Sequence, residues 1–223
     1  MIRFYFHPSP NPMKVALLLG ELEVPFETIA VDIFEGAQHE PEFRKLNPNG
    51  KVPVIVDGGI TVFDSHAILL HLAEKHGRFL ASSGAERAAT LSWLEFVATG
   101  LSPFSGQAVH FLHYAPETIP YAKNRYVREV ERHYQVLEGR LASSAFLGGP
   151  DYSIADMALW GWARGAEYIF GESRLSKYPS VERVVEGISR RPAAEKAANL
   201  KDNLKLKTAF DDETRRALFP QNA

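Results

Sequence analysis

The sequence contains no cysteine among its 223 residues. This absence excludes a disulfide-stapled secreted scaffold, a thiolate zinc site, a CxxC redox pair and a cysteine nucleophile. Long apolar runs are also missing, since no stretch approaches the ~20 residues that cross a bilayer. The opening residues, MIRFYF, do not have the layout of a signal peptide. We therefore expect a cytoplasmic globular protein without membrane contact.

An excess of charge of one sign is lacking as well. The 25 Lys and Arg residues nearly balance the 27 Asp and Glu residues, which leaves a formal charge of -2. No net electrostatic attraction to nucleic acid results, so we expect no nucleic-acid partner. The hydrophobic fraction of 45% and the charged fraction of 23% are those of an ordinary globular chain. The length allows one large domain or two small ones.

Strand and helix patterns alternate in the first eighty residues. Alternating apolar residues or apolar runs predict strands at 2–6, 26–33, 52–56 and 60–63, and helical spacing begins at 13 and again at 65. The turn Asp57-Gly58-Gly59 between the last two runs is typical of a hairpin. The predicted order is β-α-β-loop-β-β-α, a mixed parallel and antiparallel sheet with helices.

Strand signals vanish after residue 80. Helical periodicity covers 86–98, 121–141, 154–169 and 181–189, and Pro192 opens a shorter helix. Beyond residue 199 we expect a surface helix or a frayed tail. The predicted fold class is therefore α/β plus all-α, with an N-terminal domain at 1–80, a linker at 81–85 and a helical domain at 86–223.

Common catalytic signatures are absent: the sequence has no GxSxG, P-loop, GxGxxG or HExxH motif. His110 and His113 share a helical spacing, but no carboxylate lies at a matching position, so we predict no metal site there. His66, His71 and His76 are five residues apart and spiral around a helix. We interpret these three as solvated or half-buried side chains.

Two segments carry polar groups at structurally special positions. In Ser9-Pro10-Asn11-Pro12, Asn11 can be an N-cap and Pro12 a first helical residue. Alternatively, the hydroxyl and the amide bind an anion at a helix N-terminus. Ser9 lacks the nearby general base that a serine nucleophile requires.

The second segment joins a strand start to a helix start. If the Val52-Pro53 bond is cis, an extended peptide can pair with the backbone of Val52 as an added strand. Ser65 can cap the following helix. Alternatively, Asp64 binds an amine and Ser65 binds a carboxylate. Together these features describe a cleft for a short peptide with both groups.

Four strings in this order resemble the cytosolic glutathione transferases: HPSPNPMKV at 7–15, FRKLNPNGKVPVIVD at 43–57, FDSHAILLHLAEKHG at 63–77 and YSIADMALW at 152–160. The resemblance covers about residues 1–200. It implies a thioredoxin-like N-terminal domain that binds glutathione and a C-terminal helical bundle that forms the acceptor side of the cleft. It also implies a homodimer.

Residues 100–142 are similar to the nu class of bacterial glutathione transferases, which often act as glutathione-dependent disulfide-bond reductases. In that class a Thr and an Asn flank the glutathione sulfur; here Ser9 replaces the Thr and Asn11 is retained. Pro12 stands where the class has Gly, and Asp64 where it often has Glu. The Ser9 hydroxyl can still donate to the sulfur, and the shorter Asp64 side chain still offers a carboxylate.

The resemblance implies a role for each of nine residues. Ser9 and Asn11 hydrogen-bond the sulfur and are the catalytic residues. The remaining residues bind glutathione, reduced or oxidised, as a co-substrate: Gln38 and Lys51 at the glycine end, Val52 before a cis Pro53 at the cysteinyl unit, Asp64 and Ser65 at the γ-glutamyl end, and Arg132 from the helical domain of the same or the partner subunit.

We expect the activated thiol to reduce a small-molecule disulfide. Two alternatives remain open: conjugation of glutathione to small electrophiles, and a non-catalytic binding module that kept the fold. The maleylacetoacetate isomerase branch of the family is disfavoured, because its cysteine-bearing loop is absent.

Overall fold

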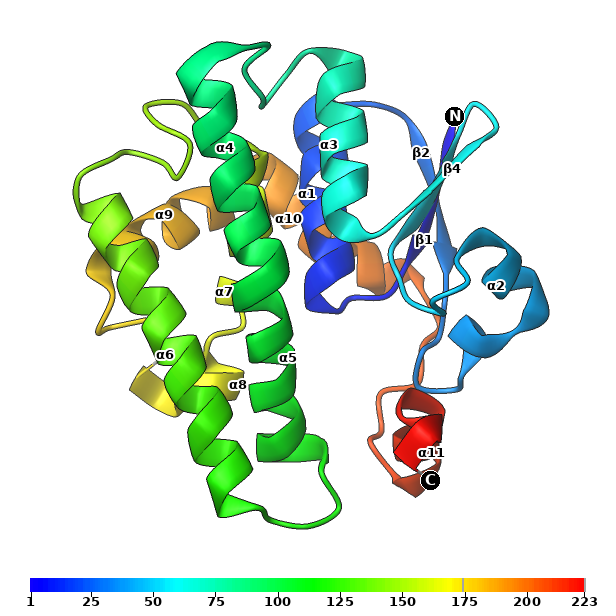
Figure 1. Ribbon diagram of the computed structural model, residues 1–223. Coiled ribbons are helices and arrows are strands. Elements are labelled where there is room, and N and C mark those ends of the chain that lie inside the picture. The colour runs from blue at the N-terminus through cyan, green and yellow to red at the C-terminus, as the bar shows by residue number, and fades with distance from the viewer. Residues whose placement is uncertain (174, 223) are drawn as a thin grey trace. The chain divides into compact units, whose positions relative to one another are not determined.

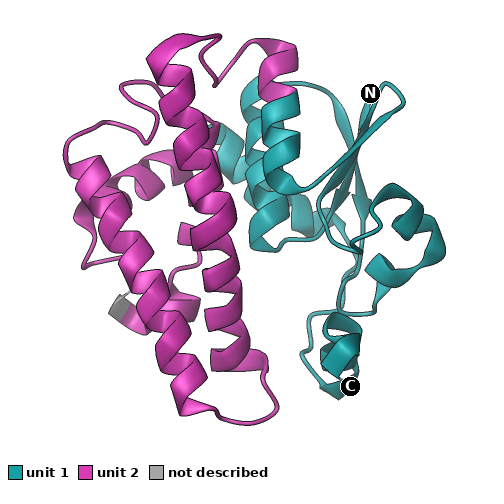
Figure 2. Cartoon of the chain, viewed as in Figure 1, with its two compact units in different colours: residues 1–71, 192–223 teal, residues 72–191 magenta. Residues whose placement is uncertain are grey.

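The computed structural model describes residues 1–173 and 175–222. The chain divides into two compact units, residues 1–71 with 192–223 and residues 72–191 (Figure 2). The division groups residues 192–223 with the first unit, although their helical pattern placed them in the helical domain. The domain boundaries inferred from the sequence stay a prediction.

The first unit holds a four-stranded sheet with helices on it. Its elements are β1 (Ile2–Phe6), α1 (Pro10–Leu22), β2 (Phe26–Ala30), η1 (Ala37–His39), α2 (Pro41–Leu46), β3 (Val54–Asp57), β4 (Ile60–Phe63), most of α3 (Ser65–His76), α10 (Pro192–Asn199), η5 (Leu200–Asn203), α11 (Asp212–Leu218) and η6 (Pro220–Asn222). The unit boundary falls within α3.

The sheet order is β2-β1-β3-β4, with β1 and β2 parallel and the other neighbours antiparallel. In β1, Ile2, Phe4 and Phe6 are buried while Arg3 is exposed, because successive side chains point to opposite faces. Helices α1 and α3 cover one face of the sheet and α2 lies on the other (Figure 1). The mixed sheet with its helices confirms the predicted α/β class.

Two local predictions for this unit are wrong. Helix α1 begins at Pro10 rather than at Met13, because proline has no N–H to lose at a first helical position. The loop predicted between the second and third strands contains η1 and α2, which its polar composition concealed. Phe43 of α2 nevertheless anchors a small core with Val31 and Val54, and its ring lies 6.0 Å from that of Tyr5.

The second unit is helical. Its elements are α4 (Gly84–Phe96), η2 (Val97–Leu101), α5 (Ser102–Val109), η3 (His110–Tyr114), α6 (Pro120–Ala142), α7 (Ile154–Ala163), α8 (Glu167–Phe170), η4 (Gly171–Ser173) and α9 (Pro179–Ser189). Together with the first unit it confirms the predicted combination of a thioredoxin-like domain and a helical domain. None of the described helices is long and apolar enough to span a membrane.

The helical backbone continues through Pro103. The π-helical turn η2 changes the hydrogen-bond register, so α5 starts at Ser102 and Pro103 takes one of its first positions, which need no N–H donor. The imidazole of His133, on α6, packs against η2 at Gly100. A Cβ at Gly100 would lie only 2.2 Å from Nε2 of His133. Gly100 is therefore required for α6 to approach this closely.

A buried capping box starts α7. The Ser153 hydroxyl accepts from the N–H of Ala155, and the Asp156 carboxylate accepts from the N–H and hydroxyl of Ser153 at 3.0 and 2.9 Å. The same carboxylate accepts from the N–H of Leu147 at 2.8 Å. Burial raises the pKa of Asp156 to about 6, against these hydrogen bonds. The box therefore ties the preceding loop to the helix start.

We predict that Asp156→Ala lowers the free energy of unfolding by about 3 kcal/mol, because it leaves three buried donors without an acceptor. Urea unfolding of the purified chain measures this change. Asp151→Ala, at an exposed position close by, is the matched control and should change stability by less than about 0.5 kcal/mol. Equal losses in the two variants would contradict the structural role of the box.

Candidate functional site

The candidate site lies at one end of the sheet in the first unit. Tyr5 of β1 faces Val54 of β3, and Val54 faces Phe63 of β4. Because β3 runs antiparallel to both neighbours, the end of β1, the start of β3 and the end of β4 lie at the same end of the sheet. Three predicted segments adjoin these paired positions: residues 9–11, 51–53 and 64–65. The structure thus brings them together.

Ser9 is the N-cap residue of α1 and has extended backbone angles, φ -84° and ψ 163°. The interpretation of Asn11 as the N-cap and Pro12 as the first helical residue is therefore wrong. The Ser9 side chain makes no capping hydrogen bond. Its half-buried hydroxyl is not used by the helix and can serve a ligand.

The start of α1 has few backbone donors. Pro10 and Pro12 carry no N–H, so Asn11 has the one backbone N–H among the first three helical positions. The N–H of Ser9 donates to the carbonyl of His7 at 2.8 Å. The helix dipole still favours an anion here. The donors that could bind that anion are concentrated on Ser9 and Asn11.

His7 lies next to this segment and is buried. Burial lowers the pKa of its imidazole to about 4, although Asp32 opposes the shift. Its ring centroid lies 5.4 Å from that of Phe34. His7 is therefore neutral at physiological pH and adds no positive charge beside Ser9.

The Val52-Pro53 peptide bond is cis, as the resemblance implies. Val52 lies two residues before the first paired residue of β3, so its backbone is not part of the sheet ladder. The side-chain amide of Asn47 donates to the carbonyl of Lys51 at 2.7 Å. This bond holds the segment before β3, while the Lys51 side chain is exposed.

Asp64 and Ser65 form the turn from β4 into α3. Asp64 has a left-handed backbone (φ 73°), and its Oδ1 accepts from the N–H of His66 at 2.9 Å. Asp64 thus caps the helix, and the interpretation of Ser65 as the cap is wrong. Ser65 is the first helical residue and is buried. The exposed Asp64 carboxylate stands beside it at the same edge.

A buried pair that the sequence did not suggest joins two of these segments. Lys14 of α1 is fully buried, and its Nζ lies 2.9 Å from Nε2 of His66. His66 is itself 7% exposed, so its interpretation as a solvated or half-buried side chain is wrong. Burial lowers the pKa of the Lys14 ammonium to about 7, and the Asp64 carboxylate opposes this shift. In the sequence, the signal for this buried pair was a lysine within the otherwise apolar run MKVALLL of α1.

Gln38 lies in η1 and is buried. Its Nε2 donates to the carbonyls of Ile33 and Ala217, at 3.3 and 3.1 Å. Its Oε1 is buried and has no hydrogen-bond partner among the described residues. The side chain is thus held within its own unit rather than directed to solvent.

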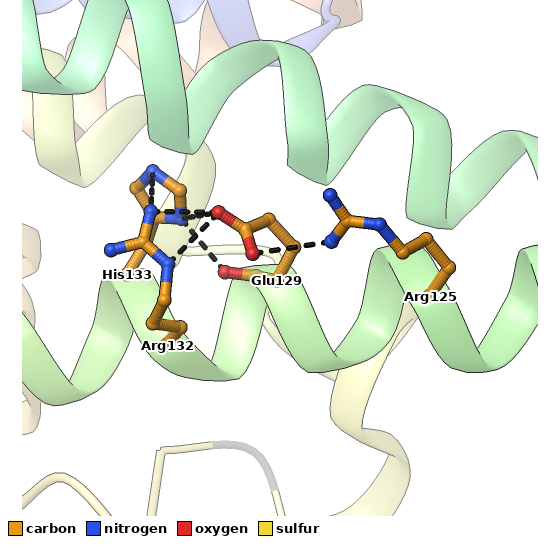
Figure 3. Close-up of polar contacts among 4 residues, drawn as sticks. All are labelled: Arg125, Glu129, Arg132 and His133. Carbon is orange, nitrogen blue, oxygen red and sulfur yellow. Dashed lines mark hydrogen bonds and ion pairs between the residues drawn. The ribbon is translucent and has the colours of Figure 1, made fainter.

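Arg132 belongs to the second unit and lies on α6 (Figure 3). Its Nε and Nη2 donate to Oε1 of Glu129 at 2.9 and 2.7 Å, and Arg125 donates to Oε2 at 3.2 Å. The paired arginines lower the pKa of Glu129, chiefly through the hydrogen bond from Arg132. Half of the Arg132 side chain is exposed. The sequence analysis did not identify this cluster; the spacing of three and four residues between its charged members was the available signal.

His133, the next residue on α6, hydrogen-bonds to both Glu129 and Arg132. Its Nδ1 donates to the backbone carbonyl of Glu129 at 2.7 Å, which leaves Nε2 to accept from Arg132 at 3.3 Å. The ring is buried against Gly100. Arg132 is therefore oriented by two neighbours and keeps Nη1 for a further acceptor.

Comparison with known proteins gives this architecture a family. The family model of the glutathione S-transferase N-terminal domain matches residues 8–75, and that of the glutathione S-transferase C-terminal domain matches residues 120–187. The disulfide-bond oxidoreductase YfcG of Escherichia coli (strain K12) is 47% identical over 204 residues, covering 88% of this chain and 94% of the relative.

Solved structures are similar along most of the chain. A glutathione transferase family member from Pseudomonas fluorescens with two glutathione molecules bound has a TM-score of 0.83 and 34% identity, covering 88% of this chain and 92% of its own. A glutathione transferase from Pseudomonas putida with one glutathione disulfide bound per subunit has a TM-score of 0.83 and 32% identity, covering 89% and 91%. Because two models of the family match it and a relative 47% identical covers 88% of its length, the chain belongs to the glutathione S-transferase family.

Proposed function

We propose that this chain catalyses the glutathione-dependent reduction of disulfide bonds. The observation that carries the proposal is the hydroxyl of Ser9, which makes no cap hydrogen bond, next to Asn11 at the N-terminus of α1. The chain has no thiol of its own, so the reacting sulfur comes from glutathione. The name of the relative from Escherichia coli and the ligands of the Pseudomonas structures support this reading.

The thiolate of glutathione is the reactive species. A free thiol has a pKa of about 8.5, so only a few per cent is ionised at neutral pH. Hydrogen bonds from Ser9 and Asn11 and the dipole of α1 stabilise the charged form. A shift of one pKa unit corresponds to about 1.4 kcal/mol, which one or two charge-assisted hydrogen bonds can supply.

The exchange then runs in two balanced steps. The thiolate attacks one sulfur of the acceptor disulfide, one S–S bond forms as another breaks, and the leaving sulfur departs as a thiolate that takes up a proton. A second glutathione repeats the attack on the mixed disulfide. Two glutathione thiols are oxidised to one glutathione disulfide, and the acceptor disulfide is reduced to two thiols.

The other site residues bind the tripeptide in this proposal. Val52, before cis Pro53, pairs through its backbone with the cysteinyl unit as an added strand. The Asp64 carboxylate binds the γ-glutamyl amine, whose charge it complements, and Ser65 donates to the γ-glutamyl carboxylate. Lys51 lies at the glycine end, with Gln38 near it. Arg132, through its remaining nitrogen, contacts glutathione in the same or the partner subunit of a homodimer. We place this dimer in the cytoplasm.

Conjugation of glutathione to an electrophilic carbon is the second candidate, because it uses the same activated thiolate. The purified chain should therefore be assayed in parallel with hydroxyethyl disulfide and with an aryl halide. We expect the disulfide rate to be the larger. We also expect activity to survive a thiol-alkylating reagent that is then removed, since no cysteine is present.

A high aryl-halide rate beside a negligible disulfide rate would reverse the order of the two candidates. Failure to bind glutathione resin at neutral pH would favour instead a binding module that has kept the fold and lost turnover.

We predict that Asn11→Ala lowers kcat by about tenfold or more while changing the affinity for glutathione much less, because its donor acts on the thiolate. Steady-state kinetics with hydroxyethyl disulfide and calorimetric titration of glutathione separate the two effects. Asn203→Ala, an exposed position in η5, is the control. Turnover of Asn11→Ala equal to that of the parent would refute the assigned role.

Ser65→Ala should instead raise the KM for glutathione, by about fivefold, with kcat little changed, since a carboxylate contact is lost that the ground and transition states share. The exposed Ser82→Ala variant provides the comparison. An unchanged KM would contradict the carboxylate contact.

A further inference from the structure

A buried lysine lies next to the turn that is proposed to bind the γ-glutamyl end of glutathione. Lys14 of α1 is fully buried, and its Nζ lies 2.9 Å from Nε2 of His66, the second residue of α3. Helices α1 and α3 cover the same face of the sheet (Figure 1), and this contact joins them where α3 begins. Taking an ammonium group out of water is costly, and perturbed ionisable groups concentrate at functional sites. The position of Lys14 therefore points to a role in the neighbouring site.

His66 connects this lysine to Asp64. Its ring contacts Lys14, while its backbone N–H donates to Oδ1 of Asp64 at 2.9 Å. His66 is buried, so the packing around it restricts its ring. Asp64 has a left-handed backbone (φ 73°), which a residue other than glycine keeps only where its surroundings hold it. The turn from β4 into α3 is therefore held by a residue whose own side chain is fixed from α1.

Lys14 and Asp64 also interact through their charges. Burial lowers the pKa of the Lys14 ammonium to about 7, and the Asp64 carboxylate favours the charged form. The positive charge of Lys14 in turn attracts the carboxylate of Asp64 toward α1. Helix α10 also packs against α1, and its buried residues are all alanines, so this helix contributes apolar contact. The electrostatic interaction of Lys14 is thus directed to the turn that begins α3.

The same lysine lies close in sequence to the residues that are proposed to bind the sulfur. Asn11 and Lys14 are three residues apart in α1, a spacing that places two side chains on one side of a helix. One side chain thus connects the helix that carries the sulfur donors to the turn that carries the partners of the amine and the carboxylate. Because Lys14 is fully buried, it acts on a ligand through these neighbours.

We propose that Lys14 is a positioning residue for the γ-glutamyl end of glutathione, which acts through His66 on the turn formed by Asp64 and Ser65. The inference rests on the proposed function and deepens it, because it makes the buried pair a determinant of selectivity for thiols that carry a γ-glutamyl group. Without the pair, the turn shifts and its contacts to the γ-glutamyl amine and carboxylate weaken. The sulfur donors at the start of α1 keep their places.

The test compares two thiols in the full chain: glutathione and cysteinylglycine, which lacks the γ-glutamyl group. Lys14→Met removes the ammonium and keeps a side chain of similar length, and His66→Leu removes the ring nitrogens but keeps the N–H that Asp64 accepts. With hydroxyethyl disulfide as the acceptor, we expect each variant to lower kcat/KM for glutathione about five- to tenfold and that for cysteinylglycine by less than about twofold. Because both changes remove one contact, the double variant should lower kcat/KM for glutathione no further.

Lys196→Met, at an exposed position of α10, is the matched control and should keep both parental values. A general loss of structure would lower kcat/KM for the two thiols equally, and that result, or unchanged selectivity in the variants, would overturn the proposal. If Lys14→Met does not fold, His66→Leu decides by the same comparison. A parent chain that uses glutathione no better than cysteinylglycine would overturn the proposal together with the γ-glutamyl contacts, whereas a parent chain that turns over neither thiol would contradict the proposed function itself.

Discussion

The pairing of β3 between two antiparallel neighbours is the constraint on which the candidate site depends. The register that sets Tyr5 opposite Val54 and Val54 opposite Phe63 places the end of β1, the start of β3 and the end of β4 at the same end of the sheet. The parallel strand β2 ends there too, and delivers the loop 32–39. A shift of one residue in β3 would turn its side chains to the other face and move the segment before it away from the start of α1.

Electrostatics at this edge are simple because the histidine beside Ser9 is neutral. Burial keeps His7 uncharged, and it brings the Lys14 ammonium near its titration point at neutral pH while Asp64 favours the charged form. Two prolines remove backbone donors from the first turn of α1. The stabilisation of an anion therefore depends on few groups, Ser9 and Asn11, set at the positive end of a helix dipole.

Much of the fold could be predicted from local pattern. The alternation in β1 and the turn Asp57-Gly58-Gly59 each act over a few residues, and each appears in the structure as predicted. Predictions failed where a distant partner decides. The polar stretch of η1 and α2 folds because Phe43 finds Val31 and Val54, and Lys14 is buried because His66 lies beside it. Neither partner is near in sequence.

The sequence by itself determined that the protein has no sulfur nucleophile, that a mixed α/β part precedes a helical part, and that polar groups stand at strand ends and helix starts. These are properties of composition and of short-range periodicity. Only the tertiary structure decided that Ser9, rather than Asn11, occupies the N-cap position of α1, that Asp64, rather than Ser65, caps α3, and that Gln38 is held by the C-terminal segment. The physical reason is that a hydrogen-bonding group is assigned by the partners that folding brings to it, and for Gln38 that partner lies 179 residues away.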